Sequence, residues 1–184
     1  MPRIIAGSAK GCRLAVPAQG TRPTADRVRE AVFSRLTSLG AIERARVLDL
    51  YAGSGALGLE ALSRGALHAD LVERAAAAAK VCRDNIAATG LPARLHRASV
   101  MTFLEETRSE WDLVFADPPY DLSGADLDAV LTRLASHVSG DAVVVVERAR
   151  RDGCPAPQAW PGAWRGYKYG ETTVWLSDLA ASAA

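Results

Sequence analysis

The chain has 184 residues, of which 49% are hydrophobic, and a formal net charge of +1 at pH 7. This length suits one domain with its own core, and no uninterrupted apolar run is long enough to span a membrane. No apolar secretory signal precedes the body of the chain, and three scattered cysteines form neither a disulfide framework nor a metal-binding cluster. These features predict a cytoplasmic protein without a metal. The histidines lie near no plausible ligand partner and are expected at the surface: His68, His96 and His137.

The charge is unevenly distributed along the chain. Residues 1–46 carry nine Arg or Lys and three acids, whereas the remainder carries 13 Arg or Lys and 18 acids. A basic leading segment joined to an acidic body is typical of an arm that binds a polyanion. Compositional bias is the alternative, because only three of the basic residues are Lys. Bias does not explain why the positive excess lies at one end.

The first 40 residues are predicted to form a small basic extension. Loose alternation around Gly7 and Gly11 predicts a β-hairpin over residues 3–17. Helical periodicity then predicts a helix that begins after Thr24, a suitable N-cap, and reaches Leu39. Each basic residue here is either a contact to a polyanion or an ordinary solvated charge. The candidates for polyanion binding are Arg3, Lys10, Arg13, Arg22, Thr24, Arg27 and Arg29.

Strands and helices alternate from Val47 onward. Strands are predicted at 47–51, 70–73, 93–96, 113–116 and 142–146, and helices at 56–64, 75–89, 100–106 and around 127–134. This alternation builds a parallel, doubly wound α/β sheet. Residues 164–169 and 172–177 flank Gly170 and predict a closing antiparallel hairpin. The predicted organisation is an extension over 1–40, an α/β domain over 41–178 and a frayed tail over 179–184.

A glycine-rich turn follows the first strand of the parallel sheet, from Asp49 to Gly58. Glycines let the main chain turn tightly and let a ligand approach it. Gly53, Gly55 and Gly58 satisfy the dinucleotide fingerprint, and Glu73, at the end of the second strand, is placed for ribose hydroxyls. Asp49 would meet a ligand's ammonium group but repel a pyrophosphate, which favours S-adenosylmethionine over a dinucleotide. Both carboxylates have the alternative role of capping strand ends.

A second motif, Asp117-Pro118-Pro119-Tyr120, follows the strand at 113–116. Proline has no N–H and a fixed φ, and it pushes the preceding residue into an extended conformation. The segment therefore presents a carboxylate, a carbonyl without a neighbouring N–H and an aromatic ring. These groups can hold a flat base and accept hydrogen bonds from its exocyclic amine. A proline-stopped strand end is the structural alternative.

The chain resembles class I methyltransferases that modify exocyclic amines, which carry an (Asn/Asp)-Pro-Pro-(Tyr/Phe) motif. Residues 3–7, 22–30 and 52–61 look more specifically like the bacterial 16S ribosomal RNA guanine-N2 methyltransferase D family. This resemblance spans nearly the whole chain and implies a Rossmann-like fold with S-adenosylmethionine as cofactor. The implied substrate is the N2 amine of one guanine in 16S rRNA, within the assembled small subunit, and the protein is expected to act as a monomer.

The resemblance also implies roles for individual residues. The cofactor pocket would be lined by Asp49, Ala52, Gly53, Gly55, Gly58, Glu73, Ser99 and Asp117. The target base would be held by the catalytic residues Asp117, Pro118, Pro119 and Tyr120. Family members often carry Asp or Asn where Ser99 stands, to bind the adenine amine of the cofactor.

Three other functions share parts of this pattern. An NAD-dependent oxidoreductase would use the same glycine turn. A non-catalytic RNA-binding module would need only the basic extension and would leave the Asp-Pro-Pro-Tyr segment without a role. An adenine-N6 methyltransferase of DNA or RNA shares the chemistry, because guanine N2 and adenine N6 present an amine to the same acceptors. The sequence leaves these two amines undistinguished.

Overall fold

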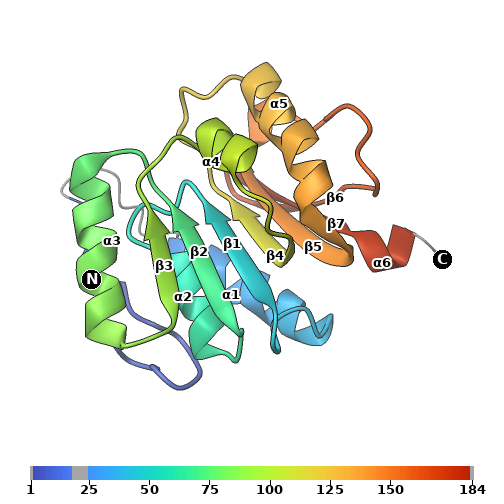
Figure 1. Cartoon of the computed structure of the whole chain (residues 1–184). Coiled ribbons are helices and arrows are strands. Elements are labelled where there is room, and N and C mark those ends of the chain that lie inside the picture. Colours follow the sequence, from blue (N-terminus) through green and yellow to red (C-terminus); the bar gives the residue numbers. More distant parts are fainter. Residues whose placement is uncertain (1, 18–24, 183–184) are drawn as a thin grey trace.

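The computed structural model describes residues 2–17 and 25–182, which fold around one mixed β-sheet (Figure 1). The strands are β1 (Arg46–Leu50), β2 (His68–Val72), β3 (Ala93–His96), β4 (Trp111–Ala116), β5 (Val138–Ala149), β6 (Arg165–Tyr169) and β7 (Thr172–Asp178). The helices are α1 (Ala25–Ser38), α2 (Ala56–Ser63), α3 (Ala76–Thr89), α4 (Val100–Glu106), α5 (Gly124–Leu134) and α6 (Leu179–Ser182). Short 3-10 helices occupy Ala135–His137 and Arg150–Asp152.

The strand order is β3-β2-β1-β4-β5-β7-β6. The first five strands in this order are parallel, and β7 pairs antiparallel with both β5 and β6. The predicted doubly wound sheet with a closing hairpin is therefore confirmed. No helix among the described residues has the length and hydrophobicity to span a membrane.

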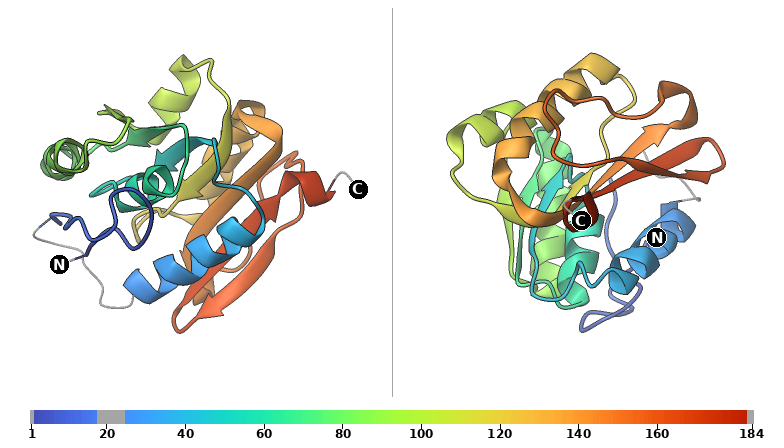
Figure 2. Two further views of the ribbon diagram at one scale, coloured as in Figure 1. Left: turned by 90° about the horizontal axis from the view of Figure 1, so that it is seen from below. Right: turned by 90° about the vertical axis from the view of Figure 1, so that its right-hand side faces the viewer.

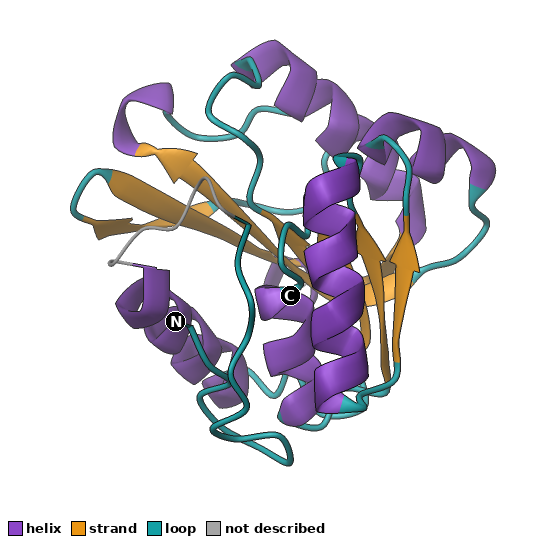
Figure 3. Cartoon of the chain, turned by 90° about the vertical axis from the view of Figure 1, so that its left-hand side faces the viewer, coloured by secondary structure: helices purple, strands orange, loops and turns teal. Residues whose placement is uncertain are grey.

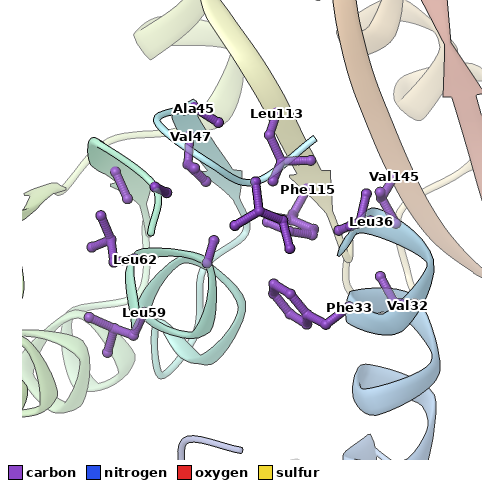
Figure 4. Close-up of a cluster of buried hydrophobic side chains, with 14 of the residues drawn as sticks. Val32, Phe33, Leu36, Ala45, Val47, Leu59, Leu62, Leu113, Phe115 and Val145 are labelled. Atoms are coloured by element: carbon purple, nitrogen blue, oxygen red, sulfur yellow. The ribbon is translucent and has the colours of Figure 1, made fainter. Parts of the chain in front are cut away.

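Helices cover both faces of the sheet, and each face has its own apolar core (Figure 3). In β4 and β5 the side chains alternate between the two cores. Phe115 and Val145 pack with α1 and α2 on one face, as Figure 4 shows, whereas Ala116 and Val146 pack with α4 and α5 on the other. We call the first of these the α1 face.

Helix α1 lies against the part of the α1 face that is formed by the C-terminal strands (Figure 2). Its buried residues Val32, Phe33 and Leu36 belong to the same core as Val174 and Leu176 of β7. On β6, the guanidinium carbon of Arg35 lies 3.7 Å from the centre of the Tyr167 ring. The predicted extension therefore shares its core with the α/β body.

The segment before α1 bends back on itself, but less regularly than the predicted hairpin. Its only described β-bridge joins Arg3 and Arg13. Ile4 N–H donates to the Cys12 carbonyl, and Gly11 N–H donates to the Ile4 carbonyl, both at 2.9 Å. The predicted pairing is present as a bend rather than as two strands.

Two polar side chains of α2 hold this segment. The carboxylate of Glu60, fully buried, accepts hydrogen bonds from the N–H groups of Ile5 at 2.7 Å and Ala6 at 3.1 Å. Ser63 Oγ accepts a hydrogen bond from Ala9 N–H at 3.0 Å. At Gly7, whose φ is +86°, a Cβ atom would lie 1.6 Å from the Ser63 carbonyl oxygen. Only glycine permits this approach.

Asn85 of α3 ties the same segment to the glycine turn. Its buried amide accepts a hydrogen bond from Ala15 N–H at 2.8 Å and donates to the Ala15 and Ser54 carbonyls, both at 2.9 Å. The extension and the turn after β1 are thus linked by one side chain.

Two expectations about the histidines are wrong, and the tail also differs from its prediction. His137 is buried rather than at the surface, and its Nδ1 lies 3.1 Å from the Ser109 carbonyl oxygen. His96 does have a partner, because its Nε2 lies 2.7 Å from Asp70 Oδ1. The predicted frayed tail is instead helical over 179–182, with Leu179 buried against the sheet.

Candidate active site

The three glycines of the turn between β1 and α2 play different parts. Gly53 has a φ of +55°, and a Cβ atom there would meet nothing closer than the Tyr51 carbonyl oxygen at 4.0 Å. A Cβ at Gly55 would lie 2.9 Å from Cys82 Sγ, and one at Gly58 would lie 2.3 Å from Leu71 Cδ2. Gly53 therefore leaves the main chain open to a ligand, while the other two allow α2 to pack closely on the sheet and α3.

Two carboxylates shape this turn. Glu73 accepts hydrogen bonds from the N–H groups of Gly53 at 3.0 Å and Ala75 at 2.6 Å. Asp49 is buried and accepts a hydrogen bond from Gly58 N–H at 2.9 Å. Both acids therefore act as caps of main-chain N–H groups, as the alternative interpretation of the sequence proposes. Their hydrogen bonds fix the conformation of the turn.

Burial raises the pKa of Asp49 to about 7, although the Gly58 N–H acts in the opposite direction. The negative charge of Glu73 raises this pKa further. A ligand's ammonium group beside Asp49 would favour the charged carboxylate and lower the pKa again. Charge at this position is therefore sensitive to an occupant of the turn.

Two other predicted cofactor residues have main-chain roles. Ala52 N–H donates to the Val72 carbonyl at 2.9 Å and so joins the turn to β2. Ser99 is the N-cap of α4, and its Oγ accepts a hydrogen bond from Thr102 N–H at 3.1 Å. Its hydroxyl also lies 2.7 Å from Thr102 Oγ1. Serine at this position is therefore engaged in capping.

A groove of about 1190 Å³ lies at the carboxyl ends of β4 and β5, on the side of α1. The four predicted catalytic residues line it, together with Ala56 and Leu57 of α2, which directly follow the glycine turn. The rest of its wall comes from α1, the ends of β4 and β5, the start of α5 with the loop before it, the 3-10 helix after β5 and the β6–β7 turn: Arg27, Val28, Arg29, Val32, Phe115, Ala116, Leu122, Leu127, Val145, Glu147, Arg148, Ala149, Asp152 and 169–172, with Val174. The glycine turn and the groove thus adjoin one another.

The Asp-Pro-Pro-Tyr segment directly follows β4, as the sequence predicts. Strand β4 pairs with β1, with Ala116 opposite Leu50, so the segment begins beside the end of β1. Asp117 and Pro119 are exposed, and the Tyr120 side chain is 67% exposed. A largely exposed aromatic ring at the rim of a groove is suited to stacking on a base.

The basic residues of the extension fall into two groups. Arg3, Lys10, Arg13 and Arg27 are exposed, as an RNA contact requires, while Arg22 and Thr24 lie outside the described residues. Arg29 differs from the expectation because only 7% of its side chain is exposed. It donates to the Arg3 carbonyl at 2.7 Å and pairs with Asp26 at 3.0 Å. Arg29 therefore supports the wall of the groove and is not exposed as an RNA contact would be.

Known proteins share this arrangement over nearly the whole chain. The family model "Conserved hypothetical protein 95" matches residues 2–178. The ribosomal RNA small subunit methyltransferase D of Escherichia coli is 38% identical over 161 residues, which cover 86% of this chain and 80% of that protein. The chain belongs to the methyltransferase D family.

Solved structures share the fold of this chain. A putative methyltransferase from E. coli superposes with a TM-score of 0.85 at 35% identity, covering 96% of this chain and 97% of that one. A Thermus thermophilus 16S rRNA N2 G1207 methyltransferase, in complex with AdoMet and guanosine, shares the fold with a TM-score of 0.69. That likeness, at 24% identity, covers 88% of this chain and 44% of the other.

These findings confirm an S-adenosylmethionine-dependent methyltransferase with a Rossmann-like fold and contradict the oxidoreductase alternative. The glycine turn fits this cofactor, because a side chain at Gly53 would fill the space that the main chain leaves open. The acids of β1 and β2 stand at the same turn.

Proposed function

We propose that this protein transfers a methyl group from S-adenosylmethionine to the N2 amine of one guanine in 16S rRNA. Membership of the methyltransferase D family carries this proposal. The groove supports it, because the Asp-Pro-Pro-Tyr segment lines a space that adjoins the glycine turn.

Asp117 and Pro118 would orient the reacting amine. The lone pair of guanine N2 is delocalised into the ring, which makes the amine a poor nucleophile. Hydrogen bonds from its two N–H groups to the Asp117 carboxylate and the Pro118 carbonyl would direct that lone pair and favour positive charge on nitrogen. When bound at the glycine turn, held by Gly53, Glu73 and Asp49, the cofactor supplies an electrophilic methyl group.

Proton removal needs no strong base. The methylated nitrogen is strongly acidic before it loses a proton, so the Asp117 carboxylate or water can accept that proton. Tyr120 would stack on the base, which contributes about 1–3 kcal/mol in nucleic-acid complexes. The guanine must leave any stack in the RNA to enter the groove.

The proposed substrate is the assembled small subunit, and we propose that the protein binds it as a monomer in the cytoplasm. The exposed residues Arg3, Lys10, Arg13 and Arg27 would contact phosphates and set the register of the RNA, as would Arg22 and Thr24 outside the described residues.

Labelled methyl transfer tests this function. Small subunits that lack the modification, naked rRNA and DNA are each supplied with the protein and labelled S-adenosylmethionine, and the labelled nucleoside is identified. We expect N2-methylguanosine, formed best in subunits. N6-methyladenosine would support the adenine alternative, and RNA binding without transfer would support the non-catalytic one.

A further inference from the structure

Glu147 stands beside Asp117 at the edge of the sheet. Strands β4 and β5 are parallel, with Phe115 opposite Val145 and Ala116 opposite Val146. Continuing this register by one residue brings Asp117 next to Glu147, and both line the groove. The predicted catalytic carboxylate therefore has a second carboxylate as its neighbour.

Both carboxylates belong to the α1 face. Val145 packs in the core of that face, and Glu147, two residues later on the same strand, points to the same side. Its antiparallel partner Val174 belongs to this core as well. On β4, Phe115 packs in the same core, and Pro118 keeps Asp117 extended so that the alternation continues.

A pair of acceptors side by side distinguishes guanine from adenine. The ring nitrogen next to the N2 amine of guanine, N1, carries a proton and is a donor. The ring nitrogen next to the N6 amine of adenine, also N1, carries a lone pair and is an acceptor. A carboxylate opposite N1 accepts a hydrogen bond from N1–H of guanine but faces the N1 lone pair of adenine. It therefore attracts guanine and repels adenine.

We propose that Glu147 determines specificity for guanine over adenine. It accepts a hydrogen bond from N1–H of the target guanine while Asp117 holds the N2 amine, a role that rests on the proposed function.

Nucleoside binding tests this role directly. Dissociation constants of guanosine, adenosine and 2-aminopurine riboside are measured on the protein saturated with S-adenosylhomocysteine. The last nucleoside keeps the 2-amine but has an unprotonated N1. We expect the wild-type protein to prefer guanosine over both others by about tenfold or more.

The variant Glu147→Gln removes the discrimination, because a side-chain amide can donate as well as accept. We expect its preference for guanosine to fall by about fivefold or more, while the affinity for S-adenosylhomocysteine stays at its wild-type value. Glu147→Asp keeps the carboxylate and should retain part of the preference. Glu171→Gln is the matched control, since Glu171 is an exposed carboxylate of the same groove, and it should leave the preference unchanged.

The outcomes separate the two proposals. An unchanged preference in Glu147→Gln, or a wild-type protein that binds all three nucleosides equally, overturns the role of Glu147 even if subunits yield N2-methylguanosine. A guanosine preference that depends on Glu147, found together with no methylation of subunits, overturns the proposed function instead.

Discussion

The carboxyl edge of the sheet has two regions that carry acidic side chains, and the two regions differ in what these side chains adjoin. At the ends of β1 and β2, Asp49 and Glu73 are bonded to main-chain N–H groups of the glycine turn. At the ends of β4 and β5, Asp117 and Glu147 line a groove of about 1190 Å³. The acids of the first region hold the main chain of the turn where the small cofactor binds, and those of the second line the space proposed for the larger substrate.

The largest expected effect is that of a change at Asp117, which should affect methyl transfer but not cofactor binding. Asp117→Ala should lower the rate of methyl transfer to small subunits by about 10²-fold or more, because an acceptor for the reacting amine is lost. The affinity for S-adenosylmethionine should stay near its wild-type value. Calorimetric titration and labelled methyl transfer measure the two quantities. Asp121→Ala, an exposed acid four residues along, is the control, and full activity of Asp117→Ala would remove this carboxylate from the mechanism.

The converse change targets the cofactor end. Glu73→Ala leaves the Gly53 and Ala75 N–H groups without their carboxylate and should weaken S-adenosylmethionine binding by about 10- to 100-fold, the range for bonds to a charged group. Guanosine binding in the groove should change little. Equilibrium dialysis with both ligands measures the contrast, and equal losses of both affinities would show that the two regions are not independent.

Asp49 makes the free energy of unfolding depend on pH. Its pKa is raised to about 7 in the folded protein, so its contribution is fully present below the ordinary value of 3.8 and is lost as pH rises to 7. Asp49→Asn should remove this slope, which reaches at most about 1.4 kcal/mol per pH unit. Urea denaturation at pH 5, 6 and 7 measures it. Equal slopes in both proteins would contradict the raised pKa.

The smallest effect concerns the rim of the groove. Arg27 is exposed and lines the groove, so Arg27→Ala should weaken binding to small subunits by several-fold. The slope of the logarithm of the binding constant against the logarithm of the salt concentration should fall by about 1. Filter binding at several salt concentrations measures both. Arg133→Ala, an exposed arginine of α5, should leave the affinity unchanged; an equal loss in both variants would mean that Arg27 makes no specific contact.

Hydrophobic periodicity predicted the elements well because it reports burial within one element. Strand ends were harder. β4 begins at Trp111 rather than Leu113, and β5 runs from Val138 rather than Ala142, with a register shift between Trp111 and Leu113. Asp112 interrupts the apolar pattern near the start of β4, so the pattern did not indicate a strand there. Its carboxylate is accommodated because it pairs with Arg46 at 2.7 Å. The same pair lowers the pKa of Asp112 to about 2.

The motifs of the site were found from the sequence, but the side chains that support them were not. Glu60 and Asn85 bind partners that lie more than 50 residues away along the chain, so local patterns could not reveal them. A signal did exist for Arg29. It precedes Val32, Phe33 and Leu36 at helical spacing, which places it on the buried side of α1.

The hydrogen bonds of Glu60, Ser63 and Asn85 also set an order of events during synthesis. The segment of residues 5–15 leaves the ribosome before its anchors on α2 and α3, which lie 54 to 70 residues later. Until those helices have formed, Ile5, Ala6, Ala9 and Ala15 have no native acceptors for their N–H groups. This segment is therefore anchored only after α2 and α3 have been made, and a stop in translation before them would leave it unanchored.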